Sequence, residues 1–139
     1  MNIKRIGNII LEVKDLDTSI KFYHDILGMP IKNERRNWVD LGQQSGGTLS
    51  LHPASITTSH TSTSKENGIL IGLTVGDLNS AVDELSDAKI EIFREVQERQ
   101  AGKNVIILDP DGYMISLFEP DFSENKEKQT SGYVGFTPE

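Results

Sequence analysis

The chain has no cysteine. Disulfides, thiolate nucleophiles and every metal site that uses a cysteine ligand are therefore excluded, and a bound metal would need histidine, aspartate or glutamate. Long apolar runs are also missing, because no stretch approaches the roughly 20 residues that span a bilayer. Residues 1–13 enter an alternating pattern without the cleavage region of a signal peptide. We therefore expect a cytoplasmic protein without a membrane partner.

Positive charge is scarce as well. The chain has 14 Lys and Arg against 21 Asp and Glu, which gives a net charge of -7. Nucleic-acid binders need a basic face, so nucleic acid is not an expected partner. The acidic balance is compatible with cationic small molecules, although most acidic proteins of this kind are acidic only for solubility. Neither a GxxxxGK phosphate loop nor a GxSxG elbow is present, which argues against nucleotide-dependent and serine-hydrolase chemistry.

What the chain does contain is an internal repeat. Six residues recur in the same order at a constant shift of 62, from 9 to 71 and from 25 to 87: Ile9, Leu11, Val13, Asp15, Leu16 and Asp25 match Ile71, Leu73, Val75, Asp77, Leu78 and Asp87. The shift occurs once, so we expect two copies of one module that face each other and no solenoid. Two such modules would share a concave surface, which is where function is to be sought.

Each copy predicts one strand, one helix and three further strands. In the first, residues 6–13 alternate as a strand with one apolar face, a helix follows with Asp17 as its N-cap and Gly28 at C′, and strands are expected near 29–33, 37–41 and 48–52. The second copy predicts a strand at 68–75, a helix at 80–88 and strands near 91–96, 103–108 and 113–119. The fold class is therefore α+β, with two βαβββ modules.

We expect residues 1–139 to form a single domain, with modules at about 5–52 and 68–120. Residues 53–67 are rich in Ser and Thr and predict a flexible linker, which could also lie over the concave surface. The C-terminal tail, 121–139, begins as a charged run and ends with Tyr133, Val134 and Phe136. That apolar ending is expected to lie against the protein's own sheet or a neighbouring chain.

Two strings near the ends of the modules resemble a known family. They are NIILEVKDLDTSIKFYHDILGM (8–29) and NVIILDPDGYMISLFEP (104–120). They are similar to the opening and closing signatures of the vicinal oxygen chelate superfamily, also called the glyoxalase, bleomycin-resistance and extradiol-dioxygenase fold. The resemblance covers roughly residues 5–120. It implies paired modules whose curled sheets form a cup with the helices on the outer face, commonly completed or doubled by a homodimer.

The resemblance also implies where a metal would lie. Metal-dependent members hold one divalent ion with His or Glu from the first and last strand of each module. Those places fall on Asn8, Ser50, Leu70 and Ser116. Leucine has no lone pair, serine hydroxyls are poor ligands, and asparagine offers only a neutral carbonyl. We therefore expect no metal and no other cofactor, and we do not expect metal-dependent glyoxalase or dioxygenase activity. Glu119 lies one strand position off the inward face and should point away from the cup.

Strand alternation supplies the remaining candidates. His52, on the cup side of its strand, could act as acid, base or ligand with Glu12 or Asp40, or simply bond a loop. Trp38, the only tryptophan, could stack on a flat or cationic ligand or serve as a core or interface aromatic. His24 is expected to be solvent-exposed, and His60 lies in the linker. The expected ligand-binding residues are Asn8, Glu12, Trp38, Ser50, His52, Leu70, Met114, Ser116 and Phe118.

Two functional hypotheses follow. In the first, a metal-free member of the fold binds a small organic molecule in its cup, cationic compounds included. In the second, an enzyme of the lyase or isomerase type uses His52 with an acidic partner, or a metal at displaced positions. A regulatory or scaffold role with a vestigial cup is a third hypothesis. The sequence alone leaves open whether any reaction is catalysed, because the fold is shared across unrelated activities.

Overall fold

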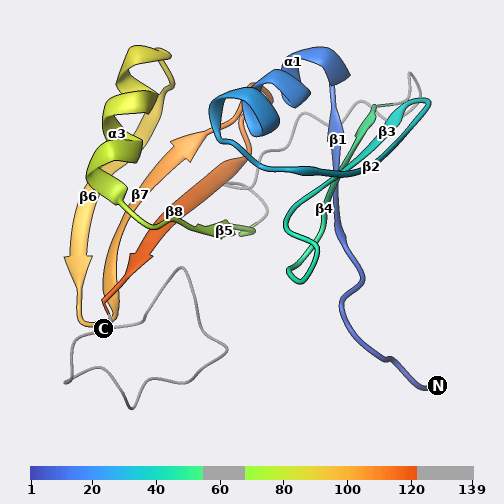
Figure 1. Cartoon of the computed structure of the whole chain (residues 1–139), viewed down its shortest axis with the longest axis horizontal. Coiled ribbons are helices and arrows are strands. Elements are labelled where there is room, and N and C mark those ends of the chain that lie inside the picture. Colours follow the sequence, from blue (N-terminus) through green and yellow to red (C-terminus); the bar gives the residue numbers. More distant parts are fainter. Residues whose placement is uncertain (55–67, 122–139) are drawn as a thin grey trace. The chain divides into compact units, whose positions relative to one another are not determined.

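The computed structural model describes residues 1–54 and 68–121. They belong to two compact units, Met1–Thr61 and Ser62–Glu139, and each carries one βαβββ module (Figure 1). The fold is α+β, and each module is an unclosed, curled mixed sheet with its helix. Most of the predicted linker and the tail residues Tyr133, Val134 and Phe136 lie outside the described residues. No helix in the described part is long and apolar enough to cross a membrane.

The first unit runs through β1 (Ile9–Val13), α1 (Leu16–Ile20), η1 (Lys21–Ile26), β2 (Ile31–Arg35), β3 (Trp38–Leu41) and β4 (Leu49–Pro53). Its strands lie in the order β1-β4-β3-β2, with β1 parallel to β4 and the other pairs antiparallel. One face of the sheet is apolar, and its buried residues pack with buried Phe22 and Tyr23 of η1: Leu11, Val13, Val39, Leu41, Leu49 and Leu51. The alternation read from the sequence is confirmed here, and it leaves the opposite face polar.

The helical segment of the first unit differs from the prediction in three details. The N-cap is Asp15, not Asp17, and Asp15 accepts a hydrogen bond of 2.6 Å from the Thr18 hydroxyl. The segment continues beyond α1 as a π-helix, η1. Gly28, at φ +79°, ends it as predicted, because glycine adopts this backbone conformation without strain. His24 is half-buried, contrary to expectation, and its Nδ1 lies 2.7 Å from the Met29 carbonyl oxygen.

The second unit repeats the plan with β5 (Ile71–Thr74), α3 (Leu78–Asp87), β6 (Ile92–Arg99), β7 (Gly102–Leu108) and β8 (Met114–Pro120). Its strands lie in the matching order β5-β8-β7-β6. Asp77 caps α3 by accepting from the backbone N–H and the hydroxyl of Ser80. The core between α3 and one sheet face is made of buried apolar residues: Leu78, Leu85, Ile71, Val105, Ile107, Ile115 and Leu117. Ile106 and Phe118, on the opposite sheet face, are buried as well. Figure 1 shows α3 lying along this sheet.

The DPDG turn between β7 and β8 owes its shape to one carboxylate. Asp109 Oδ1 accepts hydrogen bonds from the backbone N–H groups of Asp111, at 2.9 Å, and Tyr113, at 2.8 Å. Gly112 supplies the positive φ, +90°, that the tight turn requires. The turn therefore fixes the register in which Leu108 faces Met114.

A bulge recurs at the same place in both modules. The pairing of β2 with β3 shifts between Ile31 and Asn33, and that of β6 with β7 shifts between Ile92 and Arg94. β2 and β6 are the outer strands of the two sheets, at the ends of the orders β1-β4-β3-β2 and β5-β8-β7-β6. A bulge redirects the side chains of the strand in which it lies, so the same change of direction occurs in both outer strands. Asn33 and Arg94 are thus equivalent positions.

Candidate ligand-binding site

The polar face of the first unit's sheet holds a continuous hydrogen-bonded chain. The Asn8 amide donates to Ser50 Oγ at 2.9 Å, and the Ser50 hydroxyl donates to Asp40 Oδ1 at 2.6 Å. Trp38 Nε1 donates to the same Oδ1 at 2.8 Å. Ser50 and Asp40 are register partners in β4 and β3, while Trp38 precedes Asp40 by two residues and so shares its face. The sheet therefore fixes the position of a carboxylate through two donors.

The Asp40 carboxylate is held in its ionised form. The hydrogen bond from Ser50 lowers its pKa most, the bond from Trp38 lowers it further, and the positive charges of Arg35 and Lys32 act in the same direction. Partial burial opposes these effects without reversing them. Both of these hydrogen bonds end on Oδ1 and leave Oδ2 to other donors.

Four side chains form a row across this face, one from each strand. Glu12 and His52 are register partners in β1 and β4, as are Arg35 and Trp38 in β2 and β3. The His52 and Trp38 rings are stacked, with centroids 5.6 Å apart and planes 19° from parallel. Arg35 Cζ lies 5.7 Å from the centre of the indole. Since β3 lies between β4 and β2, Trp38 is flanked by His52 on one side and by Arg35 on the other.

The structure therefore brings together the three catalytic candidates without making them a hydrogen-bonded triad. His52 is next to Glu12 in register and stacks on Trp38. Asp40 receives its hydrogen bonds from Ser50 and Trp38, and His52 is not among its donors.

Lys32, on the outer strand, donates to Thr48 Oγ1 at 2.7 Å and to the Gly46 carbonyl at 3.2 Å.

The second unit carries a different polar chain on the equivalent face. Arg94 Nη2 donates to Asn104 Oδ1 at 3.3 Å, and Asn104 Nδ2 donates to Ser116 Oγ at 2.9 Å. Asn104 and Ser116 are both buried. Phe118 pairs in register with Asn104, and Met114 and Phe118 share the face of Ser116 by alternation. Leu70 precedes β5 and is half-buried.

Sequence reasoning missed Arg35, Lys32, Arg94 and Asn104. A signal for Asn104 was present, because counting outward from the DPDG turn places 108 opposite 114, 106 opposite 116 and 104 opposite 118. No such signal exists for the other three residues. Arg94 follows a bulge, and the contacts of the long Arg35 and Lys32 side chains depend on tertiary structure.

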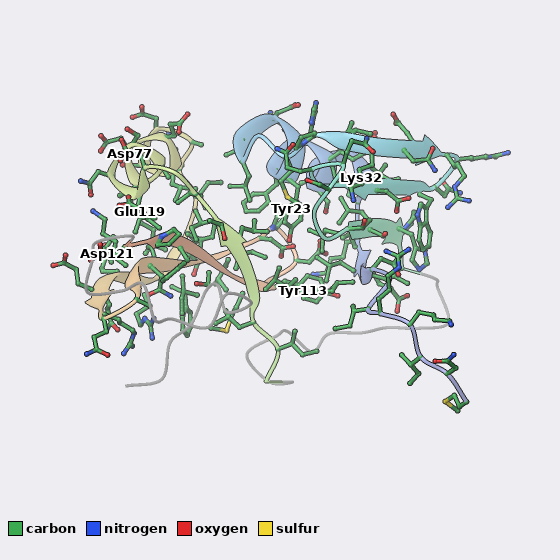
Figure 2. All side chains as sticks on the ribbon, turned by 60° about the horizontal axis from the view of Figure 1, so that its bottom comes forward. Tyr23, Lys32, Asp77, Tyr113, Glu119 and Asp121 are labelled. Carbon is green, nitrogen blue, oxygen red and sulfur yellow. The ribbon has the colours of Figure 1, made fainter. Side chains whose placement is uncertain are left out.

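The carboxylate of Glu119 is engaged elsewhere. Its Oε1 accepts a hydrogen bond of 2.7 Å from the backbone N–H of Leu78, the first residue of α3. The prediction that Glu119 points away from the polar face is confirmed, because α3 packs against the apolar face. Figure 2 shows Glu119 beneath the beginning of α3, close to Asp77.

Comparison with known proteins decides the family. The model of the Glyoxalase/Bleomycin resistance protein/Dioxygenase superfamily matches residues 5–117. The chain belongs to this superfamily. The resemblance drawn from the two signature strings is thereby confirmed.

Proteins similar to this chain carry two kinds of name. The chain is 30% identical over 128 residues to a probable lactoylglutathione lyase of Vibrio parahaemolyticus, covering 83% of this chain and 90% of that protein. It is 34% identical over 119 residues to a probable lactoylglutathione lyase of Synechocystis, covering 79% and 91%. The crystal structure of TnmS3, an antibiotic binding protein from Streptomyces sp. CB03234, is similar with a TM-score of 0.69 at 17% identity, covering 87% and 99%. At that identity the likeness shows the fold alone.

The residues at the superfamily's metal-ligand places do not fit a transition metal. Leu70 offers no lone pair, and serine and asparagine are weak ligands for zinc, nickel or iron. Asn8 and Ser50 are hydrogen-bonded to each other, and Ser116 accepts from Asn104. In residues 1–54 and 68–121 no three His, Cys, Asp or Glu side chains gather in a way that could hold a metal ion.

Proposed function

We propose that this superfamily member binds a small organic molecule, cationic compounds included, on the polar faces of its sheets and without a transition metal. The observation that carries the proposal is that Asn8, Ser50, Leu70 and Ser116 stand at the four ligand places, while the polar face of the first unit also holds an ionised carboxylate and an aromatic stack. Such a mixture of apolar wall and few oriented polar groups is typical of sites for organic ligands.

The contact between Arg35 and Trp38 supports a cationic ligand. A planar guanidinium already lies 5.7 Å from the indole centre, so this ring accepts a flat cation. Arg35 is exposed, and its long side chain can leave without disturbing the sheet. A ligand cation could then take the place of the guanidinium on Trp38.

The Asp40 carboxylate supports the same class of ligand. Its Oδ1 is fixed by Ser50 and Trp38, and its Oδ2 can accept an N–H from a molecule lying on the indole. A charge-assisted hydrogen bond of this kind is stronger than a neutral one. Glu12, at the other end of the row, adds a second negative charge.

The polar face of the second unit offers apolar and small polar contacts of its own. Met114 and Phe118 alternate with Ser116 on its polar face, and Leu70 precedes β5. We include these residues with Asn8, Glu12, Trp38, Ser50 and His52 in the proposed ligand-binding set. A homodimer and a cytoplasmic location remain predictions.

An enzymatic alternative rests on two observations. The relatives at 30% and 34% identity are named as probable lactoylglutathione lyases, and Glu12 and His52 are cross-strand neighbours. A carboxylate beside an imidazole is a common arrangement for proton transfer. In this alternative His52 would act as general acid or base with Glu12 or Asp40, or with a metal at displaced positions.

Fluorescence of the single tryptophan tests the binding proposal directly. We expect benzamidine, a flat aromatic cation, to change Trp38 emission in a saturable way, and benzoate, an anion of the same shape, to do so much less. Asp40→Asn should weaken benzamidine binding roughly tenfold, the equivalent of about 1.4 kcal/mol. Asp83→Asn removes an exposed carboxylate from α3 and serves as the matched control. Equal affinity in wild type and Asp40→Asn, or no response to a panel of aromatic cations, would contradict the proposal.

A second arm separates binding from catalysis. Lactoylglutathione lyase activity is assayed with the wild type alone and with added zinc or nickel. Activity that requires Glu12 and His52, tested as Glu12→Gln and His52→Gln, would favour the enzymatic alternative. Binding of organic cations without activity under either condition would favour the proposed function.

A further inference from the structure

A basic cluster lies on the polar face of the second unit. Arg94, Gln97 and Arg99 come from β6, and they pair in register with Ile106, Asn104 and Gly102 of β7. These three β7 positions are two residues apart, so all of them present the same face of the sheet. Two guanidinium groups and two amides therefore share one surface.

The fully buried residues of this cluster orient its half-buried arginines. Asn104 is 2% exposed and Ser116 is 0% exposed, and the bond between them fixes which way the Asn104 amide points. Its carbonyl oxygen then accepts from Arg94 Nη2, while Arg99 Nη2 donates to Gln97 Oε1 at 3.0 Å. A guanidinium has five N–H donors, so one bond can orient it while others meet a ligand. Each arginine thus donates to a neutral amide oxygen on the same face.

The charge balance around Arg94 favours an anion. Burial lowers its pKa most, and the positive charge of Arg99 lowers it further. An anion between two guanidinium groups would relieve both effects. The nearby carboxylates Glu98 and Glu119 pair in register with Lys103, which presents the opposite face of the sheet.

The internal repeat indicates that this cluster is not required by the fold. Asn104 corresponds to Trp38 at the shift of 66 that also relates Ser116 to Ser50, and Arg94 corresponds to Asn33 after the repeated bulge. The same backbone positions thus carry an aromatic stack in one unit and arginine with asparagine in the other.

We propose that Arg94 and Arg99 form an oxyanion site, which binds the carboxylate or phosphate group of a small molecule on this face of the second unit. The planar fork of arginine matches both groups through paired N–H bonds, and Asn104 is a positioning residue for the fork. Met114 and Phe118 would contact the organic part of the ligand. Neither arginine takes part in the proposed cation contact at Trp38 and Asp40, so either proposal can fail alone.

The test uses the full chain with inorganic phosphate and with succinate, each compared with sodium chloride at equal ionic strength. Binding is followed by the arginine Nε–H resonances in NMR and by the melting temperature. We expect saturable shifts of the Arg94 resonance with a Kd on the order of 1 mM, and a melting temperature that rises above the chloride control. A response to phosphate alone assigns a phosphate group, a response to succinate alone assigns a carboxylate, and a response to both supports a general oxyanion site.

Variants decide whether Arg94 is responsible. Arg94→Gln should abolish the response, whereas Arg36→Gln, which removes an exposed arginine of the first unit, should retain it. Arg94→Lys keeps the charge without the fork and should bind about tenfold more weakly, which provides the test if Arg94→Gln fails to fold. An unchanged affinity in Arg94→Lys, an undiminished response in Arg94→Gln, or no response of the wild type beyond chloride would overturn the proposal.

Discussion

Glu119 Oε1 and the backbone N–H of Leu78 are joined by a hydrogen bond of 2.7 Å. The bond ties the last strand of the second unit to the first residue of α3 (Figure 2). The first N–H groups of a helix lack intrahelical partners, and a negative charge is favourable there. The Glu119 carboxylate, near the end of the closing signature string, therefore stabilises the fold.

Glu119→Ala should accordingly destabilise the protein. We expect the free energy of unfolding to fall by about 1 kcal/mol, as for the loss of other helix caps, when it is measured by urea denaturation. Glu119→Gln should retain most of the stability, because its amide oxygen can still accept from Leu78. Glu95→Ala, at an exposed position of β6, is the control. Unaltered stability of Glu119→Ala would show that the bond is unimportant.

Much of this framework could be predicted from the sequence. Alternation in residues 9–13 placed Leu11 and Val13 in the core, and the repeat carried the same plan to β5. Gly28 marked a helix end because few other residues adopt its φ of +79°. These features depend on local chemistry, so one sequence suffices to find them.

The features that escaped prediction depend on contacts between distant residues. The bond from Arg94 to Asn104 crosses a bulge whose position no local pattern announces. His24 faces the Met29 carbonyl because the helix continues as a π-helix, which shifts its side chains relative to α-helical spacing. Alternation along each strand was enough to predict which site candidates lie on the polar faces of the sheets. To predict the hydrogen bonds between them, the register of three neighbouring strands would have to be known.

The stability of the first unit should depend on ionisation of Asp40. The pKa of this carboxyl is lowered in the folded protein, mainly by the hydrogen bond from Ser50. Its stabilising contribution is therefore present above the unfolded pKa, near 3.8, and is lost as the pH falls toward the lower folded pKa. Asp40→Asn should remove this part of the pH dependence of unfolding, and Asp83→Asn should not.

Asp40→Ala should cost more than Asp40→Asn at neutral pH. It leaves the buried hydroxyl of Ser50 without its acceptor, which costs about 1–3 kcal/mol. The double variant Asp40→Ala/Ser50→Ala should recover part of the loss, because no hydroxyl is then left unsatisfied. A double variant no more stable than Asp40→Ala would argue against the Ser50–Asp40 bond as the cause.

The stack of His52 on Trp38 should be measurable as a coupling energy. Trp38→Ala, His52→Ala and the double variant form a cycle, and we expect a coupling of about 0.5–1.5 kcal/mol for rings 5.6 Å apart. Trp38 emission should also change in His52→Ala. In His24→Ala, whose imidazole contacts the Met29 carbonyl, emission should stay as in the wild type. Additive single effects would mean that the stack contributes nothing.

Removal of metal should leave the protein unchanged if Asn8, Ser50, Leu70 and Ser116 replace the usual ligands. A metal present at 100 times its Kd would stabilise the folded state by about 2.7 kcal/mol, so its loss to a chelator would lower the melting temperature by a few degrees. We expect the same melting temperature with and without EDTA, and a zinc and nickel content well below one ion per chain by mass spectrometry. The decisive counter-result is a stoichiometric ion whose removal lowers the melting temperature, because ligands must then come from outside these four positions.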